Sequence, residues 1–401
     1  MRKLWWYLDF LIFITLILIV VYTWIPVLYQ DSKTSYQAVK RRWNHSPGHY
    51  KQVKTILFWN KMYAEKHTDF MFGVGDIFKN CPVPHCYATP DRKLFNFITD
   101  YDAILFHGIE MQLNDLPTYR STHQRYIYFS WESPVSRPLN DHEFVLNPNF
   151  YNWTMSYRLD SDIRRPYGQI RDIKSNKIIA PPRDPDGIVK WRSPYDNKYI
   201  PTEDEMLIIK GKKKMAAWFV SHCETNSQRE ILVNNLQQYF EIDVYGKCGD
   251  KHCNKTINHD CYNLVERDYY FYLSFENTLC RNYITEKLFL PMEKYVIPVV
   301  YGGADYAQFV PPHSYIDVRN FNDTGQLAKF LSKLSNNPTE YAKYFWWKKY
   351  YSIEDTNEST LCDLCEKLHD PTLPRKSLEN FKKYYIRDQC VYTKLINATV
   401  A

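Results

Sequence analysis

The stretch that decides the fold is residues 271–303, FYLSFENTLCRNYITEKLFLPMEKYVIPVVYGG. Within it, 271–275 and 296–301 are short runs rich in aromatic and β-branched residues, which are typical of buried strands. An amphipathic segment that opens at Thr285 predicts a helix between them. Two strands joined by a helix over this distance form a βαβ unit, and ligands of such sheets bind at the carboxyl ends of the strands. The sequence therefore predicts an α/β protein with a binding site in this stretch.

Four polar side chains fall at that edge of the predicted sheet: Glu276, Asn277, Glu286 and Lys287. A carboxylate accepts hydrogen bonds from ribose hydroxyls, whereas a lysine ammonium and the amides of a helix start favour phosphate. The pattern thus predicts a nucleotide diphosphate site, although a solvated turn between two strands fits it as well. Pro291 lies inside the predicted helix and removes a hydrogen bond, so we expect this helix to be short or bent.

The segments FYLSFEN and NYITEKL and the strand VIPVV resemble the donor motif of the α1,3-fucosyltransferases, glycosyltransferase family 10. Members of that family are inverting enzymes that use GDP-fucose. The resemblance implies that Asn277, Tyr283, Glu286 and Lys287 contact the nucleotide sugar. The polar insertion at 242–261, IDVYGKCGDKHCNKTINHDC, is similar to invertebrate members of the family.

A second segment, QRYIYFSWESP at 124–134, places Glu132 directly after an apolar run and before Pro134. A carboxylate just past the end of a strand, followed by a proline that favours an extended turn, is well placed to face a cleft. From the residues alone, a solvated turn residue is the alternative. The segment is similar to the one that carries the general base of the fucosyltransferases, which implies that Glu132 takes the proton of the acceptor hydroxyl.

A third segment, AWFVSHCETNSQR at 217–229, ends in Arg229 at the start of a predicted helix. An arginine at such a place is often a surface charge. The segment is similar to the family loop whose arginine binds the donor diphosphate, with His222 where asparagine is common. A planar guanidinium can hold two phosphate oxygens at once, so the resemblance assigns Arg229 to the diphosphate.

The segment 152–168, NWTMSYRLDSDIRRPYG, contains Asp160 and Asp162 at a spacing that could hold a divalent cation on a donor diphosphate. A metal-dependent glycosyltransferase is therefore one alternative reading. The segment is also similar to the YR-x-DSDI-x-x-PYG motif of the α1,3-fucosyltransferases, which implies a structural or acceptor-side role for both aspartates. On that reading no metal or other cofactor is obligatory, and Mn²⁺ is at most stimulatory.

Residues 10–28 form an almost uninterrupted apolar segment preceded by Arg2 and Lys3. At 1.5 Å per residue this segment reaches roughly 28 Å, close to the hydrocarbon thickness of a bilayer. A cleaved signal peptide is the alternative, but we expect a retained signal anchor because no small-x-small cleavage site follows before Asp31. The prediction is a single-pass type II protein of the Golgi membrane, with residues 1–9 cytoplasmic, 29–50 a stem and the rest lumenal.

The chain has ten cysteines and six N-glycosylation sequons, which fit a secretory passage. The sequons are at Asn44, Asn152, Asn254, Asn322, Asn357 and Asn397. A zinc site built from Cys362, Cys365, His369 and Cys390 is conceivable, but disulfides are favoured in an oxidising compartment. The resemblance implies that the Cys362–Cys365 pair staples the tail to the amino-terminal domain, with Cys81 and Cys86 the candidate partners.

The predicted architecture is the GT-B type, in which two Rossmann-like domains face a cleft. The predicted parts are an acceptor-side domain at 51–185, a proline-rich linker at 186–210, a GDP-fucose-binding domain at 211–350 and a tail at 351–401 that contains the CxxC pair. Two amphipathic helices are expected in the second domain. The first places Leu232, Leu236 and Tyr239 on one face, and the second places Leu327, Phe330, Leu331 and Leu334 in the core.

The net charge of +6 is modest and dispersed, which argues against a nucleic-acid partner. The resemblance implies an inverting transfer of L-fucose from GDP-fucose to O3 of N-acetylglucosamine in glycans of glycoproteins or glycolipids. The sequence leaves the acceptor open between the N-glycan core and a LacNAc or LacdiNAc antenna. A membrane-anchored glycan-binding protein without turnover is the alternative from another class.

Overall fold

The computed structural model describes residues 32–44, 52–63, 67–135, 148–194, 199–253, 258–385 and 389–391. By its internal contacts the chain forms two compact units. The first comprises 1–106, 115–125 and 361–374, and the second comprises 107–114, 126–360 and 375–401. The segment predicted to span the membrane, 10–28, lies outside the described residues. Among the helices of the described ranges, none combines the length and the apolar character that crossing a bilayer requires.

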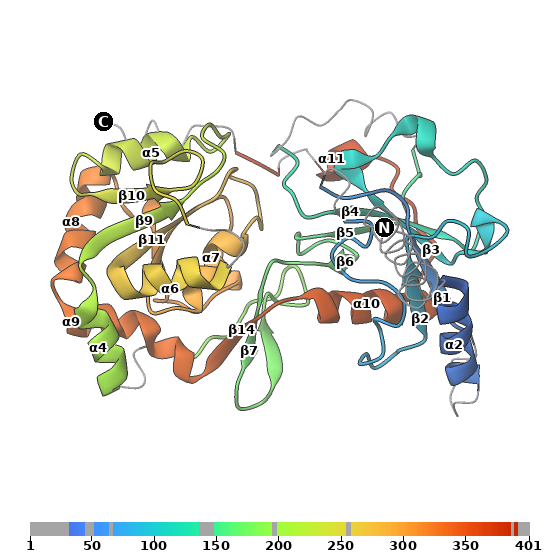
Figure 1. Ribbon diagram of the computed structural model, residues 1–401, viewed down its shortest axis with the longest axis horizontal. Helices are drawn as coiled ribbons and strands as arrows, with labels where there is room; N and C mark the ends of the chain where they lie inside the picture. Colours follow the sequence, from blue (N-terminus) through green and yellow to red (C-terminus); the bar gives the residue numbers. More distant parts are fainter. Residues whose placement is uncertain are drawn as a thin grey trace, which may run out of the picture. The chain divides into compact units, whose positions relative to one another are not determined.

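The second unit is built on a sheet of five parallel strands (Figure 1). Its members are β9 (Lys214–Phe219), β10 (Ile242–Tyr245), β11 (Tyr269–Phe275), β12 (Ile297–Tyr301) and β13 (Ile316–Asp317). They lie in the order β10-β9-β11-β12-β13. The chain therefore places β10 on one side of β9 and the later strands, β11 to β13, on the other side. In open α/β sheets a ligand crevice forms at such a switch point, outside the carboxyl ends of the strands.

Helices cover both faces of this sheet (Figure 1). On one face α4 (Glu203–Gly211), α5 (Arg229–Leu236), α8 (Thr324–Ser335) and α9 (Pro338–Ala342) contribute to a single apolar core. On the other face lie α6 (Asn258–Asp268) and α7 (Glu286–Met292). The α/β fold with parallel sheets is therefore confirmed.

Two side chains do not follow the helical spacing that the sequence predicts: Tyr239 was expected on one face of its helix, and Phe330 in the core. Helix α5 ends at Leu236, so Tyr239 falls beyond the helix and is 56% exposed. Phe330 is 37% exposed on α8 and contacts Phe321, with ring centroids 5.4 Å apart. Helical periodicity was wrong for Tyr239 because the helix stops early, and for Phe330 because that position lies at the margin of the buried stripe.

Helix α7 is short, as Pro291 in its last turn predicted. It begins after Thr285, whose side chain accepts a hydrogen bond from the backbone N–H of Lys287 at 3.3 Å. A threonine at this position satisfies one of the unpaired N–H groups at the start of a helix. The short helix presents Glu286 and Lys287 immediately after β11 and its loop.

The predicted linker at 186–210 is not wholly irregular, because α4 begins inside it. Thr202 caps this helix: its hydroxyl accepts from the N–H of Glu205, and its own N–H donates to the Glu205 carboxylate. This reciprocal capping box stabilises the first turn. The carboxylate also accepts from Tyr199 at 2.8 Å and from Tyr295 at 2.9 Å, which anchors α4 to the sheet domain.

The second unit contains further strands. Parallel β4 (Arg125–Ser130), β5 (Trp153–Ser156) and β6 (Ile163–Arg164) are followed by the antiparallel set β7 (Gln169–Asp172), β8 (Lys177–Ala180) and β14 (Tyr351–Glu354). Helix α11 (Phe381–Tyr385) also belongs to this unit, whereas α10 (Asn357–His369) belongs to the first unit from residue 361 onward. Short 3-10 turns lie at 98–100, 108–110, 113–115, 306–308, 318–320 and 343–349.

The first unit contains β1 (Lys54–Phe58), β2 (Cys86–Thr89) and β3 (Ala103–His107), with parallel pairing in the order β2-β1-β3. Part of the predicted stem, α2 (Ser32–Asn44), is a helix. Its Tyr36 is buried and its ring lies 5.4 Å from that of Tyr87. This part of the stem is thus packed against the unit, because Tyr36 and Val39 place apolar groups three residues apart on one helical face.

All ten cysteines are paired in disulfides. The bonds are Cys81–Cys362, Cys86–Cys365, Cys223–Cys248, Cys253–Cys261 and Cys280–Cys390. The prediction of disulfide bonds is therefore confirmed.

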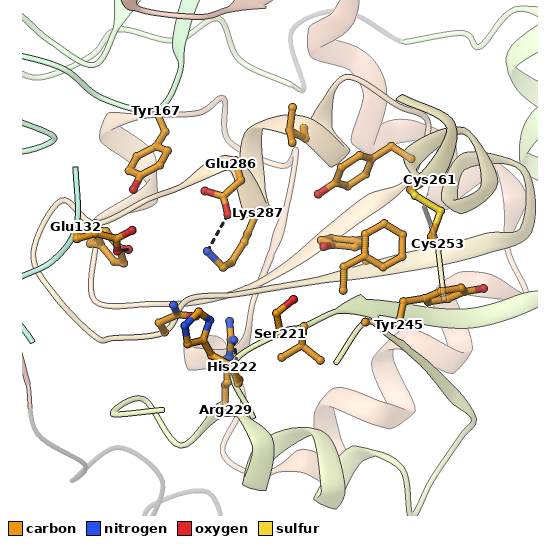
Figure 2. Close-up of a pocket in the computed structure, with 18 residues that line it drawn as sticks. Glu132, Tyr167, Ser221, His222, Arg229, Tyr245, Cys253, Cys261, Glu286 and Lys287 are labelled. Carbon is orange, nitrogen blue, oxygen red and sulfur yellow. Dashed lines mark hydrogen bonds and ion pairs between the residues drawn. A yellow bond between two sulfur atoms is a disulfide. The ribbon is translucent and has the colours of Figure 1, made fainter. Parts of the chain in front are cut away.

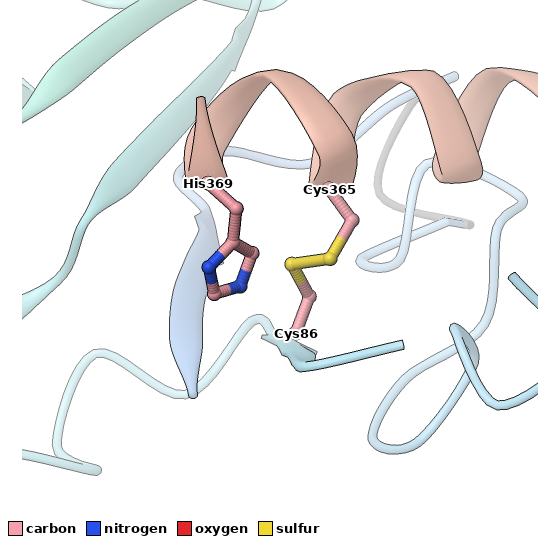
Figure 3. A group of neighbouring side chains, drawn as sticks. All are labelled: Cys86, Cys365 and His369. Atoms are coloured by element: carbon pink, nitrogen blue, oxygen red, sulfur yellow. A yellow bond between two sulfur atoms is a disulfide. The ribbon is translucent and has the colours of Figure 1, made fainter. Parts of the chain in front are cut away.

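The three cysteines of the conceivable zinc site are each paired in one of these disulfides. They are Cys362, Cys365 and Cys390. Figure 3 shows the imidazole of His369 beside the Cys86–Cys365 bond. Sulfurs joined to each other are not thiolates and cannot ligate a metal as thiolates do. His369 Nε2 lies 2.9 Å from the carbonyl oxygen of His85, and burial lowers the pKa of His369. The neutral imidazole is therefore a structural neighbour of the disulfide.

The two disulfides of α10 close nearly the same loop, with sequence separations of 281 and 279 residues. With Cys81–Cys362 intact, Cys86–Cys365 closes a ring of only about ten residues, so we expect serine at both Cys86 and Cys365 to cost about 2–3 kcal/mol. Removing both bonds opens the long loop and is expected to cost about 8 kcal/mol, more than the two single losses together. Free energies of unfolding in urea measure these differences, and strictly additive losses would contradict the argument.

Candidate active site

A cavity of about 400 Å³ lies at the switch point of the five-stranded sheet, where β9 and β11 end (Figure 2). All of the residues that line it belong to the second unit. They are Glu132, Tyr167, Phe219, Val220, Ser221, His222, Arg229, Tyr245, Gly246, Cys253, Cys261, Tyr262, Tyr272, Asn277, Tyr283, Glu286, Lys287 and Leu290. The structure thus brings all six residues of the predicted catalytic and donor set into one cavity, from segments as far apart as 132 and 287.

Lys287 is the best-defined cation of the cavity. Its Nζ lies 3.0 Å from both the hydroxyl of Thr285 and a carboxylate oxygen of Glu286, and 3.6 Å from Glu276 Oε2. Desolvation acts to lower the pKa of this ammonium, but Glu286 and Glu276 outweigh it and hold the pKa above its ordinary value. Lys287 is therefore a firmly charged group with part of its surface turned to the cavity.

Glu276 is a buried carboxylate next to Lys287. Its side chain is 1% exposed, and Oε1 accepts from the backbone N–H of Thr285 at 2.8 Å and from its hydroxyl at 3.0 Å. Desolvation raises the pKa of this carboxyl, and Lys287 and the Thr285 donors oppose the rise. Because Glu276 is bound by Thr285 and does not line the cavity, it is the neighbouring Glu286, which lines the cavity and is 49% exposed, that can offer its carboxylate to a ligand.

Arg229 lies deeper than the sequence indicated. It is 2% exposed, and its Nη1 and Nη2 donate to the carbonyl oxygens of Phe275 at 2.6 Å and His222 at 3.3 Å. Its buried Nε has no hydrogen-bond partner among the described residues. Burial lowers the pKa of the guanidinium, although the group remains charged at neutral pH. Arg229 therefore ties the ends of β9 and β11 together and presents only its remaining N–H groups to a ligand.

Asn277 follows β11 at the cavity wall. Its backbone carbonyl accepts from the N–H of Ser227 at 3.1 Å, which holds this loop to the one before α5. Its side-chain oxygen Oδ1 is buried and makes no hydrogen bond within the described ranges of the chain. A buried acceptor without a partner is costly in a protein that binds nothing, so this atom marks a position for a ligand donor.

Glu132 and Tyr283 meet across the cavity. The Tyr283 hydroxyl donates to Glu132 Oε2 at 3.0 Å, although the two residues are 151 positions apart. Burial raises the pKa of Tyr283 well above its ordinary value, so the phenol stays a neutral donor. Beside them the rings of Trp131 and Tyr167 stack, with centroids 5.0 Å apart and planes inclined by 12°.

The other end of the cavity is aromatic, and sequence reasoning missed it. Figure 2 shows Tyr245 and the Cys253–Cys261 disulfide at the end away from Glu132. The ring of Phe219 lies 5.4 Å from those of both Tyr262 and Tyr272. From the sequence, the insertion at 242–261 was interpreted only by its similarity to invertebrate members of the family. Phe219 at the end of β9, Tyr245 at the end of β10 and Tyr272 within β11 were the available signal, but their pattern equally fits core packing. Aromatic rings at one end and cations at the other suit a ligand with a planar base and an anionic group.

Comparison with known proteins gives two family matches. The fucosyltransferase N-terminal family matches residues 51–168, and the family described as glycosyltransferase family 10 (fucosyltransferase) C-term matches 209–384. The chain is also 40% identical over 334 residues to alpha-(1,3)-fucosyltransferase C of Drosophila melanogaster, which covers 81% of this chain and 75% of that protein. The chain belongs to glycosyltransferase family 10. It is therefore an enzyme of the fucosyltransferase family, similar to invertebrate members.

Two further similarities were found. The alpha-(1,3)-fucosyltransferase fut-1 of Caenorhabditis elegans is 31% identical over 303 residues, which are 75% of this chain and 60% of that protein. A crystal structure of an alpha1,3-fucosyltransferase with GDP-fucose is 12% identical, covers 84% of this chain and 97% of that one, and superposes with a TM-score of 0.47.

In this fucosyltransferase-family chain, both aspartates of the DSD segment are bound by neighbouring side chains. Arg158 Nε donates to Asp160 at 2.8 Å, and the two form an ion pair. Asp162 Oδ2 accepts from the N–H of Thr154 at 2.9 Å and is paired with Lys376. Neither aspartate belongs to the set of described residues that line the cavity.

The sequons differ in their surroundings. Asn322 is exposed, whereas Asn152 is partly buried, with Oδ1 accepting from Tyr126 N and Nδ2 donating to Lys376 O, both at 2.8 Å. Asn357 is partly buried, and its Oδ1 accepts from Arg165 at 2.9 Å. Asn254, Asn397 and the side chain of Asn44 lie outside the described residues.

Replacing Lys287 by methionine tests whether its charge stabilises the buried carboxylate of Glu276. The change leaves Glu276 buried without its cation, and we expect a loss of roughly 3 kcal/mol in the free energy of unfolding at pH 7. The folded-state pKa of Glu276 is already raised and rises further, so protonation at low pH relieves the penalty. The deficit should therefore shrink as the pH falls from 7 towards about 4.5. Lys343→Met, which breaks an exposed pair with Glu340, is the control and should cost under about 0.5 kcal/mol at either pH.

Proposed function

We propose that this chain is an inverting α1,3-fucosyltransferase that transfers L-fucose from GDP-fucose to O3 of N-acetylglucosamine in glycoprotein or glycolipid glycans. The observation that carries the proposal is the shared cavity, because Glu132 and the cations Arg229 and Lys287 all line it. The name of the Drosophila relative, alpha-(1,3)-fucosyltransferase C, supports the linkage. The acceptor is a glycan of the N-glycan core or of a LacNAc or LacdiNAc antenna.

The two ends of the cavity suit the two ends of GDP. The rings of Phe219, Tyr262 and Tyr272 offer apolar faces for the guanine. Glu286 accepts hydrogen bonds from the ribose hydroxyls. The Oδ1 atom of Asn277 accepts a further hydrogen bond from the donor, and Tyr283 helps to hold the fucose end beside Glu132.

Lys287 and the remaining N–H groups of Arg229 hold the diphosphate. As the bond from fucose C1 to the diphosphate breaks, negative charge grows on the departing GDP. Cations already fixed at that place stabilise the transition state without reorganising, and this is an efficient form of catalysis. Lys287 is well fixed, since Thr285, Glu286 and Glu276 surround its Nζ.

Glu132 acts as the general base. Its carboxylate removes the proton from the acceptor O3 while O3 forms its bond to C1 from the face opposite the diphosphate. One displacement at C1 inverts the anomeric configuration. The hydrogen bond from Tyr283 orients the carboxylate, because it fixes Oε2 at 3.0 Å from a buried phenol.

The proposal extends to architecture and location. The family matches at 51–168 and 209–384 support an acceptor-side half and a GDP-fucose-binding half, as in GT-B enzymes. The apolar segment 10–28 supports a type II Golgi membrane anchor, with the catalytic part in the lumen. Five disulfide bonds are consistent with that oxidising compartment.

Glu132→Gln is the direct test of the base. The amide keeps the shape of the side chain but cannot accept the proton, so we expect transfer to fall at least about 100-fold while GDP affinity changes less than about twofold. The measurement uses the full-length enzyme in detergent, with labelled GDP-fucose and a panel of defined glycans. Glu224→Gln, at an exposed position in the β9–α5 loop, is the matched control. Unchanged transfer by Glu132→Gln would remove this residue from the mechanism, and no transfer to any glycan by the unmodified chain would favour a binding protein.

Chelation separates this mechanism from a metal-dependent one. Because Asp160 and Asp162 are engaged by Arg158, Thr154 and Lys376, we expect EDTA to leave at least half of the activity. Mn²⁺ should stimulate no more than a few-fold, through the diphosphate itself. Loss of activity in EDTA with full recovery on adding Mn²⁺ would contradict the proposal, and Asp160→Asn would then identify the ligand.

A further inference from the structure

The segment that follows α10 reaches both sides of the cavity within the second unit. We call its described residues, 375–385 and 389–391, the C-terminal strap. Leu378 exchanges backbone hydrogen bonds with Asn149 and Tyr151, each of 2.9 Å, beside β5. Phe381 of α11 then packs on Tyr128 of β4, with ring centroids 4.5 Å apart. The strap is therefore attached along the strands that lead to Glu132.

The far end of the strap is attached to the donor loop between β11 and α7. Cys390 forms a disulfide with Cys280. On either side of this bond, Arg281 N donates to Gln389 O at 2.7 Å and Val391 N donates to Leu279 O at 2.9 Å. This loop carries Asn277 and Tyr283, so the strap contacts the two elements that hold the proposed base and the proposed donor ligands.

Between these attachments, the last residue of α11 lies against the turn that carries Glu132. Tyr385 is fully buried, and its hydroxyl donates to the backbone carbonyl of Glu132 at 2.9 Å, with Ser130 Oγ at 3.1 Å. Ser130 Oγ in turn lies 3.2 Å from both the N and the O of Glu132. The turn is thus held on its backbone side by Tyr385 while Tyr283 holds the carboxylate.

We infer that Tyr385 is a positioning residue for fucosyl transfer, acting through the backbone of Glu132. The inference rests on the proposed role of Glu132 as the base. A carboxylate at the end of a turn moves by a large fraction of an ångström when the turn rotates, and proton abstraction in a displacement reaction is sensitive to such shifts. Tyr385 does not line the cavity and acts only through the position of Glu132.

The neighbouring residue provides a matched control. Tyr384 also lies in α11, and its hydroxyl is 3.2 Å from both Ser161 Oγ and Thr154 Oγ1, away from the Glu132 turn. Tyr385→Phe and Tyr384→Phe each remove one hydroxyl from the same helix. The full-length enzyme in detergent is assayed for kcat, for KM of GDP-fucose and of a glycan acceptor, for the pH dependence of kcat, and for thermal unfolding.

We expect Tyr385→Phe to lower kcat about tenfold, with KM of GDP-fucose within about twofold, and to move the acidic limb of the pH profile of kcat. Tyr384→Phe should leave kcat within about twofold and the profile unchanged, even if both variants melt at similarly lower temperatures. Equal losses of kcat in the two variants, or an unaffected kcat in Tyr385→Phe, would overturn the inference.

If Tyr385→Phe fails to fold, Ser130→Ala replaces it as the test. This variant deletes a single oxygen that contacts both the Glu132 backbone and the Tyr385 hydroxyl. The same loss of kcat, with KM of the donor unchanged, is then expected, and wild-type kcat would overturn the inference. The role of Glu132 as the general base is tested independently of the tyrosine variants. Full transfer by Glu132→Gln would refute that role whatever Tyr385→Phe and Tyr384→Phe show. An inactive Glu132→Gln with a wild-type Tyr385→Phe would refute only the positioning role.

Discussion

The buried carboxylate of Glu276 is the interaction on which the rest of the site depends. A carboxylate that is 1% exposed is costly unless donors surround it, and Thr285 and Lys287 supply those donors. Meeting that requirement fixes the loop from β11 to α7 and the first residues of α7. The same loop carries Asn277 and Tyr283, so one electrostatic constraint places most of the proposed donor ligands.

A second constraint holds the proposed base. Glu132 lies on a turn after β4, and a turn at a sheet edge is free to move unless other elements bind it. Tyr283 binds its carboxylate and Tyr385 its backbone carbonyl, from two segments far along the chain. Both phenols are buried, so water does not compete for these hydrogen bonds, and the carboxylate keeps its direction toward the cavity.

Covalent bonds reinforce the walls of the same cavity. Cys223–Cys248 joins the loop after β9 to the loop after β10, and Cys253–Cys261 is itself part of the lining. Cys280–Cys390 fixes the donor loop from the C-terminal side. Loops at the carboxyl ends of strands carry the chemistry of α/β proteins, and disulfides limit their motion without using the side chains that a ligand needs.

The sequence by itself determined the parallel strands, the short helix after Thr285, the family and the residues that share the cavity. The strands and the helix are encoded in alternation and capping over some tens of residues, which local physics expresses, whereas the family and the cavity residues were given by the resemblance of sequence motifs. The early end of α5 before Tyr239, the start of α4 inside the expected linker and the helix within the expected stem depend on which apolar faces find partners. Only the tertiary structure decided that Glu276 supports Thr285 and Lys287, that Arg229 is buried on backbone carbonyls, and that Tyr283 and Tyr385 converge on Glu132. Those contacts join residues up to 253 positions apart, and no local pattern specifies them because they exist only once the strands have assembled.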